Sequence, residues 1–469
     1  MMLPKLKPAD QSPSDPPLRV LPGGNVGPQP VTLDRFIAWY GRHYDLFSAL
    51  ERVGDGRVAA RVKVPLPTLL LAVVVGFWVG LESVNALDDR LRHNPGLRAL
   101  LGRLTGYDRA FCDDTLRDAL AKLDPGELRS LVHEQGQRGA KQWGARHYLD
   151  CELARRLRPI HSSHLAAKLV VAIDGHELLA SRSRCCKDCR VRNRTLERGG
   201  KKVTVVEYYH TLVVAFWVGT HPGLVLDFEP VPPGRGELST AYKLLERLAR
   251  VYSDAIGIVL ADALYDCEPW RALAQNHGYR VVHAQKDKRK DPGHAARQAL
   301  DRRDPGRRSP DWTYTDPDTQ NVYRVWEQPI DEGTRRYIDA TRTSKNGTVH
   351  RATLVTDLPK DAANAVAVVR LYESRWWIEN TAFHELQGRW SFGHAYVHKD
   401  RPAAVLAYVA LAILAFNALQ MYVYRHLHRQ PGAKPRSLNA YRHDLRETMI
   451  LCARKAFALA EEIASLRGP

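Results

Sequence analysis

The sequence has few cysteines, seven in 469 residues. A low and odd number of cysteines is not the framework of a disulfide-stabilised extracellular domain, and it favours a reducing compartment. Residues 1–17 also lack the apolar core of a signal peptide. Together these absences argue against a small secreted scaffold and favour a protein of the cytoplasm.

Long apolar segments are confined to two places, residues 64–81 and 403–423. Each approaches the ~20 residues that span a membrane. The second segment contains Asn417 and Gln420, and the first changes to an amphipathic pattern after Leu81. We therefore interpret both as buried helices and expect no association with a membrane.

Acidic residues are too few to balance the basic ones. There are 69 Lys and Arg against 52 Asp and Glu, which gives a net charge of +17. Such an excess indicates a polyanionic partner, most simply nucleic acid. The length of 469 residues predicts two or three domains.

The two ends of the chain differ in pattern from its middle. Residues 1–30 are rich in Pro and Gly and predict a disordered arm. Residues 31–165 predict an all-helical N-terminal domain. Its arginines allow a helix-turn-helix-like DNA-binding role, and a purely structural bundle is the alternative. Residues 431–469 predict a helical C-terminal tail.

From residue 166 onward, short β-branched runs alternate with helical patterns. Residues 166–290 read as three strands, a helix, a strand, a helix and a strand, the first part of an α/β core with a mixed sheet and flanking helices. Residues 291–358 predict a β-rich insertion of four strands, long enough for a separate subdomain, and 359–430 complete the core. The basic stretch 286–308 predicts a mobile loop or DNA-contacting arm. Its candidate DNA contacts are Lys286, Lys288, Arg289 and Lys290.

Three acidic residues follow the elements of this predicted core. Asp174 ends its first predicted strand, Asp262 ends the fourth, and Glu379 lies on a predicted helix at 371–387. Ligands collect at strand ends in open sheets. Two Asp and one Glu can hold two hard cations through oxygen, and such a pair stabilises the attacking and leaving oxygens of a phosphoryl displacement. The alternative for each Asp is a turn or helix cap.

The predicted helix at 371–387 has a polar face opposite an apolar one. Tyr372, Arg375 and Glu379 share that face at i, i+3 and i+7. An Arg can clamp a phosphate, a Tyr can stack or donate, and a Glu can hold a divalent metal. A solvated face with an i,i+4 ion pair is the alternative. The apolar stripe consists of Leu371, Trp376, Ile378, Phe383 and Leu386.

Other acidic residues near these motifs have simpler explanations. Glu373 and Glu385 are alternatives to Glu379, but each lies six residues away and faces another side of the helix. Glu237 opens a helix and is a candidate to support the three acids. Asp266 is expected to cap the helix that begins near Pro269, and Asp361 the helix that leads into 371–387.

Three stretches resemble a DDE transposase of the insertion-sequence IS4 group, which has an RNase H-like catalytic core. They are VVAIDGHE around Asp174, VLADALYDCEPW around Asp262 and LYESRWWIENTAFHEL around Glu379. The last is similar to the Tyr–Arg–Glu–Lys signature of that family. The closing Lys is missing, because the expected positions hold Leu386 and Gln387. Gln387 or the nearby Arg389 is the candidate replacement as a phosphate contact.

The resemblance implies an enzyme that transfers DNA strands. Asp174, Asp262 and Glu379 would bind two Mg²⁺ ions, which Mn²⁺ can replace, for cleavage at the ends of a mobile element and joining to target DNA. It also implies a homodimer on double-stranded DNA, comprising terminal inverted repeats and target, in a bacterial-type cytoplasm at the nucleoid. Two alternatives stay open: a catalytically inactive DNA-binding derivative, and a nuclease with the same core.

The same resemblance assigns DNA contacts to aromatic and basic residues. Tyr372 and Arg375 would contact terminal phosphates or a displaced base near the cut. A Trp of the β-rich insertion, Trp312 or Trp326, would stack on that base. Both tryptophans have the alternative of an ordinary core or surface residue.

A cluster of cysteines lies in the stretch SRSRCCKDCRVR. Cys185, Cys186 and Cys189 contain a Cys-x-x-Cys spacing, which is half of a structural zinc site. The candidates to complete it are His176, His210 and Cys267. The alternative is a loop of reduced thiols.

Overall fold

A computed structural model describes residues 31–81, 83–141, 168–219, 222–285, 292–390, 401–426 and 436–454. Several predictions fall outside these residues. They are the disordered arm at 1–30, the domain boundary near 165 and the four basic contacts Lys286, Lys288, Arg289 and Lys290.

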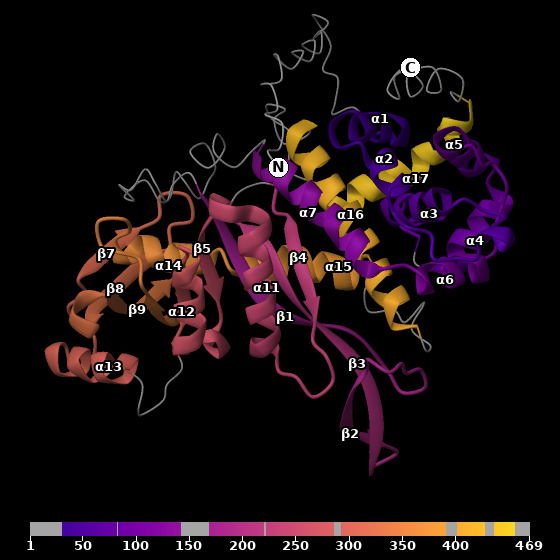
Figure 1. Cartoon of the computed structure of the whole chain (residues 1–469). Helices are drawn as coiled ribbons and strands as arrows, with labels where there is room; N and C mark the ends of the chain where they lie inside the picture. The colour runs from indigo at the N-terminus through magenta and orange to yellow at the C-terminus, as the bar shows by residue number, and fades with distance from the viewer. Residues whose placement is uncertain are drawn as a thin grey trace, which may run out of the picture. The chain divides into compact units, whose positions relative to one another are not determined.

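A ten-stranded mixed sheet is the centre of the described structure (Figure 1). The strand order is β2-β3-β1-β5-β6-β10-β9-β8-β7, and β4 pairs with β3. β5 pairs in parallel with both β1 and β6, and the other pairs are antiparallel. The strands are β1 (Leu169–Ser181), β2 (Arg190–Arg198), β3 (Lys201–Val218), β4 (Val225–Pro230), β5 (Ile256–Ala261), β6 (Arg280–Ala284), β7 (Trp312–Thr315), β8 (Val322–Ile330), β9 (Arg335–Thr343) and β10 (Val349–Thr356).

Helices and short helical turns pack on this sheet. α11 contacts β3 and β4, α12 contacts β6, and α14 contacts β6 and β8. This mixed α/β arrangement is consistent with an RNase H-like core and confirms the predicted fold class at that level. The elements are α11 (Glu237–Tyr252), η3 (Ser253–Ala255), η4 (Ala263–Tyr265), α12 (Glu268–Asn276), α13 (Pro292–Arg303), η5 (Asp331–Gly333), α14 (Ala365–Glu373), η6 (Ile378–Phe383) and α15 (His384–Gly388).

The four strands predicted for the insertion are confirmed as β7 to β10. β10 pairs antiparallel with β6, through Leu354 opposite Ala284, so the insertion extends the core sheet. For the stretch 286–308, the prediction of a mobile loop is wrong at residues 292–303, where α13 forms. Ala296 and Leu300 of α13 lie one turn apart and are buried in a small core with Trp326.

The sequence prediction missed one strand, β2. Four strands instead of three precede α11, because residues 190–198 pair with β3. The sequence of β2, RVRNRTLER, has no apolar run, since the hairpin that it forms with β3 is largely exposed. A strand without a buried face leaves no periodicity to detect.

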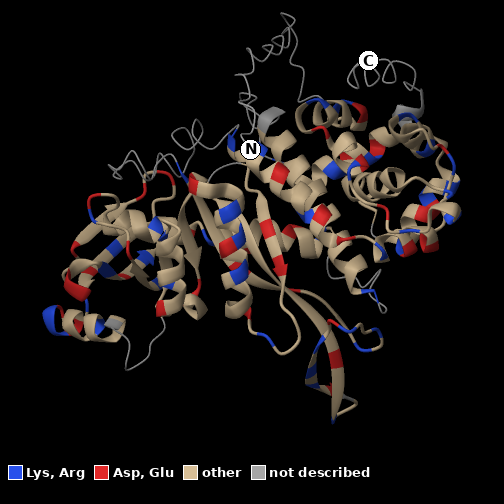
Figure 2. Cartoon of the chain, in the orientation of Figure 1, with Lys and Arg blue, Asp and Glu red and all other residues tan. Residues whose placement is uncertain are grey.

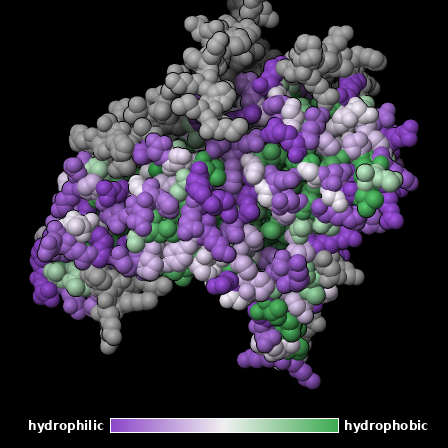
Figure 3. Space-filling model, in the orientation of Figure 1, coloured by the Kyte–Doolittle hydropathy of each residue, from purple (hydrophilic) through white to green (hydrophobic). Residues whose placement is uncertain are grey.

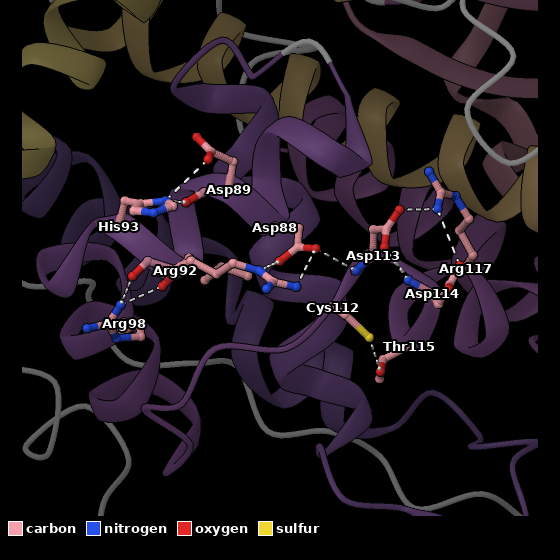
Figure 4. Close-up of polar contacts among 11 residues, drawn as sticks. Asp88, Asp89, Arg92, His93, Arg98, Cys112, Asp113, Asp114, Thr115 and Arg117 are labelled. Atoms are coloured by element: carbon pink, nitrogen blue, oxygen red, sulfur yellow. Dashed lines mark hydrogen bonds and ion pairs between the residues drawn. The ribbon is translucent and has the colours of Figure 1, made fainter.

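The N-terminal segment is helical, as predicted. Two of its arginines are engaged within it: Arg92 donates to Asp88, and Arg98 donates to the carbonyl oxygens of Leu91 and Arg92 (Figure 4). The elements are α1 (Leu33–Tyr44), α2 (Leu46–Glu51), η1 (Ala59–Arg61), α3 (Leu66–Trp78), α4 (Val84–His93), α5 (Pro95–Thr105), α6 (Asp113–Ala121) and α7 (Pro125–Gly139).

Two C-terminal helices, α16 (Pro402–His426) and α17 (Leu438–Arg454), pack on these N-terminal helices. α16 is long and apolar enough to cross a membrane by length and composition, but 83% of its most apolar window is buried within the protein. The side chain of Asn417 hydrogen-bonds both the amide nitrogen (2.9 Å) and the carbonyl oxygen (2.8 Å) of Val225 in β4. α3 and α16 are therefore buried helices in this structure, as the sequence predicted.

Basic residues are spread over many elements. Figure 2 shows them among acidic residues on the N-terminal helices, on α13 and on the hairpin of β2 and β3. The net charge of +17 therefore does not by itself locate a surface for DNA.

Candidate active site

Asp174 and Asp262 emerge at the same edge of the parallel strand pair β1 and β5. The parallel pairing runs from Leu169 to Ala172 on β1, and Asp174 lies two residues beyond it. Asp262 follows Ala261, the last residue of β5. One prediction needs correction: Asp174 does not end its strand, because β1 continues to pair with β3 as far as Ser181.

The segment that carries Glu379 is not one continuous α-helix, contrary to the prediction. α14 ends at Glu373, a turn holds Arg375, and residues Ile378–Phe383 form a π-helix before α15. The hydroxyl of Ser374 donates to the carbonyl oxygen of Leu371 at 2.6 Å, a bond that interrupts regular helix pairing. π-helical turns often occur at functional sites, because they shift the side chains that follow.

This interruption changes which residues lie on the buried face. Leu371, Ile378, Phe383 and Leu386 are buried as predicted, but Trp376 is 53% exposed. The apolar stripe was derived from a constant helical period, and that period fails at the turn. Asn364 caps α14 through a hydrogen bond from the Ala367 amide, so the prediction that Asp361 is the cap was wrong.

Arg375 bridges two of the three acids. Its Nη1 lies 2.9 Å from Oδ2 of Asp174, and its Nη2 lies 2.8 Å from Oε1 of Glu379. The guanidinium also lies 5.6 Å from the ring centroid of Tyr372. The structure therefore brings together Asp174, Tyr372, Arg375 and Glu379, which are up to 205 residues apart in sequence.

Negative charge is concentrated around Asp174. Burial raises the pKa of its carboxyl to about 7, and the nearby charges of Asp262, Glu237 and Glu379 act in the same direction, against Arg375. Only 16% of the Asp174 side chain is exposed. Burial likewise raises the pKa of Glu237, and the charge of Asp262 adds to it.

Glu237 is held against this cluster by neighbours in the core. It accepts a hydrogen bond from the hydroxyl of Tyr265 at 2.9 Å. Its carboxylate fills the space that a side-chain carbon on Gly175 would occupy, so a larger residue at position 175 would push Glu237 out of this position. The sequence had suggested Glu237 as a supporting residue. It gave no signal for Tyr265, because an aromatic residue after a strand usually marks the core.

The donor set fits a divalent cation in chemistry, with one geometric condition. Carboxylate oxygens are the ligands that Mg²⁺ prefers, and an added cation offsets the negative charges that act together with burial to raise the pKa of Asp174. Among the described residues, however, the three ligand atoms that gather within 4.8 Å of one another belong to Cys186, Cys189 and His210. The three acids are not gathered so closely, so a cation shared by all three requires them to draw together, and Arg375 already pairs with one oxygen of Asp174 and one of Glu379.

Gln387 and Arg389, the two candidate phosphate contacts that follow Glu379, have different partners. The amide oxygen of Gln387 lies 3.1 Å from Nε2 of His176, whose ring stacks on Phe383 at a centroid distance of 4.2 Å. Gln387 is thereby placed beside β1, two residues along from Asp174. Arg389 instead pairs with the buried Glu385. This ion pair directs the Arg389 side chain toward α15, which carries Glu385.

The two candidate tryptophans differ in exposure. Trp312 is 43% exposed at the start of β7 and stays a candidate for stacking. Trp326 is 1% exposed, and its Nε1 donates to Asp304 at 2.7 Å. The prediction that Trp326 stacks on a DNA base is therefore wrong, because no ligand can reach its ring.

The remaining acids have structural partners. Glu373 accepts hydrogen bonds from Tyr323 and Arg342, so it attaches α14 to the insertion strands β8 and β9. Asp266 is buried against Arg271 at 2.8 Å. It is not the cap of α12, a position that Cys267 occupies, contrary to the prediction.

Comparison with known families identifies the class of protein. The family model described as transposase DDE domain matches residues 166–417, which is more than half of the chain. The protein therefore belongs to the family of DDE transposases, enzymes that bind DNA and generally use divalent metals. No curated protein matches the chain.

Proposed function

We propose that this protein is a cut-and-paste transposase that cleaves DNA at the ends of a mobile element and joins them to target DNA. The observation that carries the proposal is the bridge of Arg375 between Asp174 and Glu379, with Asp262 and Glu237 adding charge nearby. The cationic side chain of Arg375 thereby holds together two acids that are distant in the sequence.

Asp174, Asp262 and Glu379 are the proposed ligands of two Mg²⁺ ions. When bound, such a pair activates water and stabilises the oxygens of the displaced phosphate. Mn²⁺ is expected to substitute. One carboxylate oxygen of Asp262 accepts a hydrogen bond from the Leu264 amide at 2.7 Å, which fixes the orientation of the carboxylate. Glu237 is proposed to orient this side of the site through Tyr265 and is not assigned as a ligand.

Arg375 and Tyr372 are proposed to receive the DNA backbone. The guanidinium has a fork of donors that matches a phosphate, and a phosphate would compete with the carboxylates for it. On this proposal Arg375 exchanges Glu379 for a phosphate when DNA binds, and Glu379 becomes free to act as a ligand. Gln387 supplies a neutral donor where the Tyr–Arg–Glu–Lys signature that this segment resembles has Lys.

The DNA is proposed to be double-stranded terminal repeats and target, bound by a homodimer because two element ends must be joined together. The place of action is the cytoplasm, at the nucleoid. Short inverted repeats in the DNA that flanks this reading frame would provide the substrate for the test.

A cleavage assay on those repeats tests the acidic site. Wild type and Asp254→Asn, an exposed acid on η3, are expected to cut in Mg²⁺ or Mn²⁺ and not in EDTA, whereas Asp262→Asn is not expected to cut. Equal cutting by Asp262→Asn would refute the assignment of the acids. Binding of the repeats without any cutting by the wild type would establish the inactive DNA-binding alternative.

Product analysis separates the transposase from a nuclease. Strand-joined products should appear when cleaved ends are mixed with target plasmid. Cut ends without joined products would establish the nuclease alternative. Arg375→Lys keeps the positive charge but loses the forked N–H donors of the guanidinium, so we expect weaker binding of the repeats and slower cutting.

A further inference from the structure

A second cluster of potential metal ligands lies away from the acids, beside the turn that joins β1 to β2. Cys186 and Cys189 come from the turn, and His210 comes from β3, where it stands opposite Leu179 of β1. All three side chains are buried, with exposed fractions of 9%, 6% and 7%. Three soft or borderline ligands buried together from two separate segments are unusual for a surface turn.

The distances between the ligand atoms are those of a tetrahedral site. Sγ of Cys186 and Sγ of Cys189 are 3.8 Å apart, and Nε2 of His210 lies 3.3 and 3.4 Å from them. Zinc bonds of about 2.3 Å to sulfur and about 2.0–2.1 Å to nitrogen place tetrahedral ligand atoms about 3.6–3.8 Å apart. The cluster needs to expand by only a few tenths of an ångström to receive the ion.

We infer that Cys186, Cys189 and His210 bind a zinc ion that ties the β1–β2 turn to β3. Binding displaces the thiol protons to solvent, because thiolate is the form that coordinates zinc. The three protein ligands would leave the fourth position of a tetrahedral zinc ion open, and a water molecule would fill it. Nothing in this inference depends on the acids around Asp174.

The structure selects the ligands among the residues that the sequence offered. Cys185 is exposed and does not belong to the cluster. His176 is engaged with Gln387 and Phe383 at the acidic site, and Cys267 lies 3.6 Å from the hydroxyl of Tyr242. His210 is therefore the residue that completes the Cys-x-x-Cys pair.

The position of the ion gives it a structural role. The β2–β3 hairpin begins at the pair Arg190 and Tyr209, directly beside Cys189 and His210. Beyond this base the hairpin is exposed, and Figure 3 shows apolar side chains among polar ones on it. The exposed apolar residues are Val191, Val203 and Val206. With little core of its own, the hairpin takes its direction from its base, where zinc fixes the turn to β3.

Metal analysis of the full-length protein tests the inference, with Cys185→Ser as the matched control. Wild type and Cys185→Ser, purified without chelator from zinc-supplemented cells, should contain about one zinc ion per chain. Cys186→Ser and Cys189→Ser should contain less than about a tenth of that. Cobalt loading should give thiolate-to-cobalt charge-transfer and tetrahedral d–d bands in the first two proteins only.

Substitutions of His210 guard against loss of zinc through misfolding. His210→Cys supplies another zinc ligand and should retain the metal, whereas His210→Ala should lose it. Far-UV circular dichroism confirms that each variant is folded. Wild type without zinc, Cys186→Ser with a full complement of zinc, or a Cys186–Cys189 disulfide in protein from reducing cytoplasm would overturn the inference.

Discussion

The carboxyl of Asp174 makes the stability of this protein depend on pH, and the substitution Asp174→Asn should remove that dependence. The pKa of this group is raised from 3.8 to about 7 in the folded protein, chiefly by burial. Because the folded state binds this proton more tightly than the unfolded state, the contribution to stability is complete below 3.8 and is lost as the pH rises through about 7.

The magnitude follows from the size of that window. The pKa rises by about three, and each pH unit corresponds to about 1.4 kcal/mol, so the contribution to the free energy of unfolding is about 4 kcal/mol across the whole range. Between about pH 5.5 and pH 8.5 only the interval below 7 contributes, so the wild type should lose about 2 kcal/mol relative to Asp174→Asn. The side chain is 16% exposed, so screening by solvent removes little of this.

Urea unfolding in EDTA at those two pH values measures the effect. The difference in free energy of unfolding between Asp174→Asn and wild type should shift in favour of the variant by about 2 kcal/mol at the higher pH. Asp254→Asn is the matched control and should follow the wild type. An identical difference at both pH values would show that Asp174 is not titrating as a buried, crowded carboxyl.

Three further predictions concern other parts of the structure. Asn417→Ala leaves the Val225 amide and carbonyl groups buried without partners, and should lower the free energy of unfolding by about 2–5 kcal/mol in urea titrations; a loss below about 0.5 kcal/mol would contradict the role of α16 as a buried helix. Trp312→Ala should weaken binding to the terminal repeats by about 1–3 kcal/mol without changing stability, whereas Trp326→Phe should lower the urea midpoint without changing binding; the reverse pattern would refute the assignment by exposure. Gln387→Lys should tighten binding and steepen its logarithmic salt dependence by about 0.9, and an unchanged slope would place this position away from phosphate.

Much of the architecture could be predicted because local patterns carry it. The strands of the insertion and the helices α11 and α12 have periodic apolar residues, and the buried α3 and α16 are apolar over most of their length. β2 was missed because an exposed ribbon buries neither face. α13 was missed because it has only two buried apolar residues, Ala296 and Leu300, in a basic stretch, and these stabilise the helix only by packing against Trp326.

The site was predictable in its residues and not in its geometry. The spacing of Tyr372, Arg375 and Glu379 predicted a shared helical face, but the turn at Ser374 and the π-helix replaced it. The periodicity of the sequence does not predict this interruption. It depends on a side-chain hydrogen bond and on the attraction of Arg375 to Asp174, which lies 201 residues away on β1.

The sequence by itself determined the kind of protein: a basic chain with three acids in the order of a DDE transposase and a half zinc motif. Only the tertiary structure decided that Arg375 joins Asp174 to Glu379, that Trp326 is buried and Trp312 is exposed, and that His210 lies beside Cys186 and Cys189. The physical reason is that composition and spacing act along the chain. Charge pairing, burial and metal geometry depend on distances in space, which the sheet sets by bringing β1, β3 and β5 together.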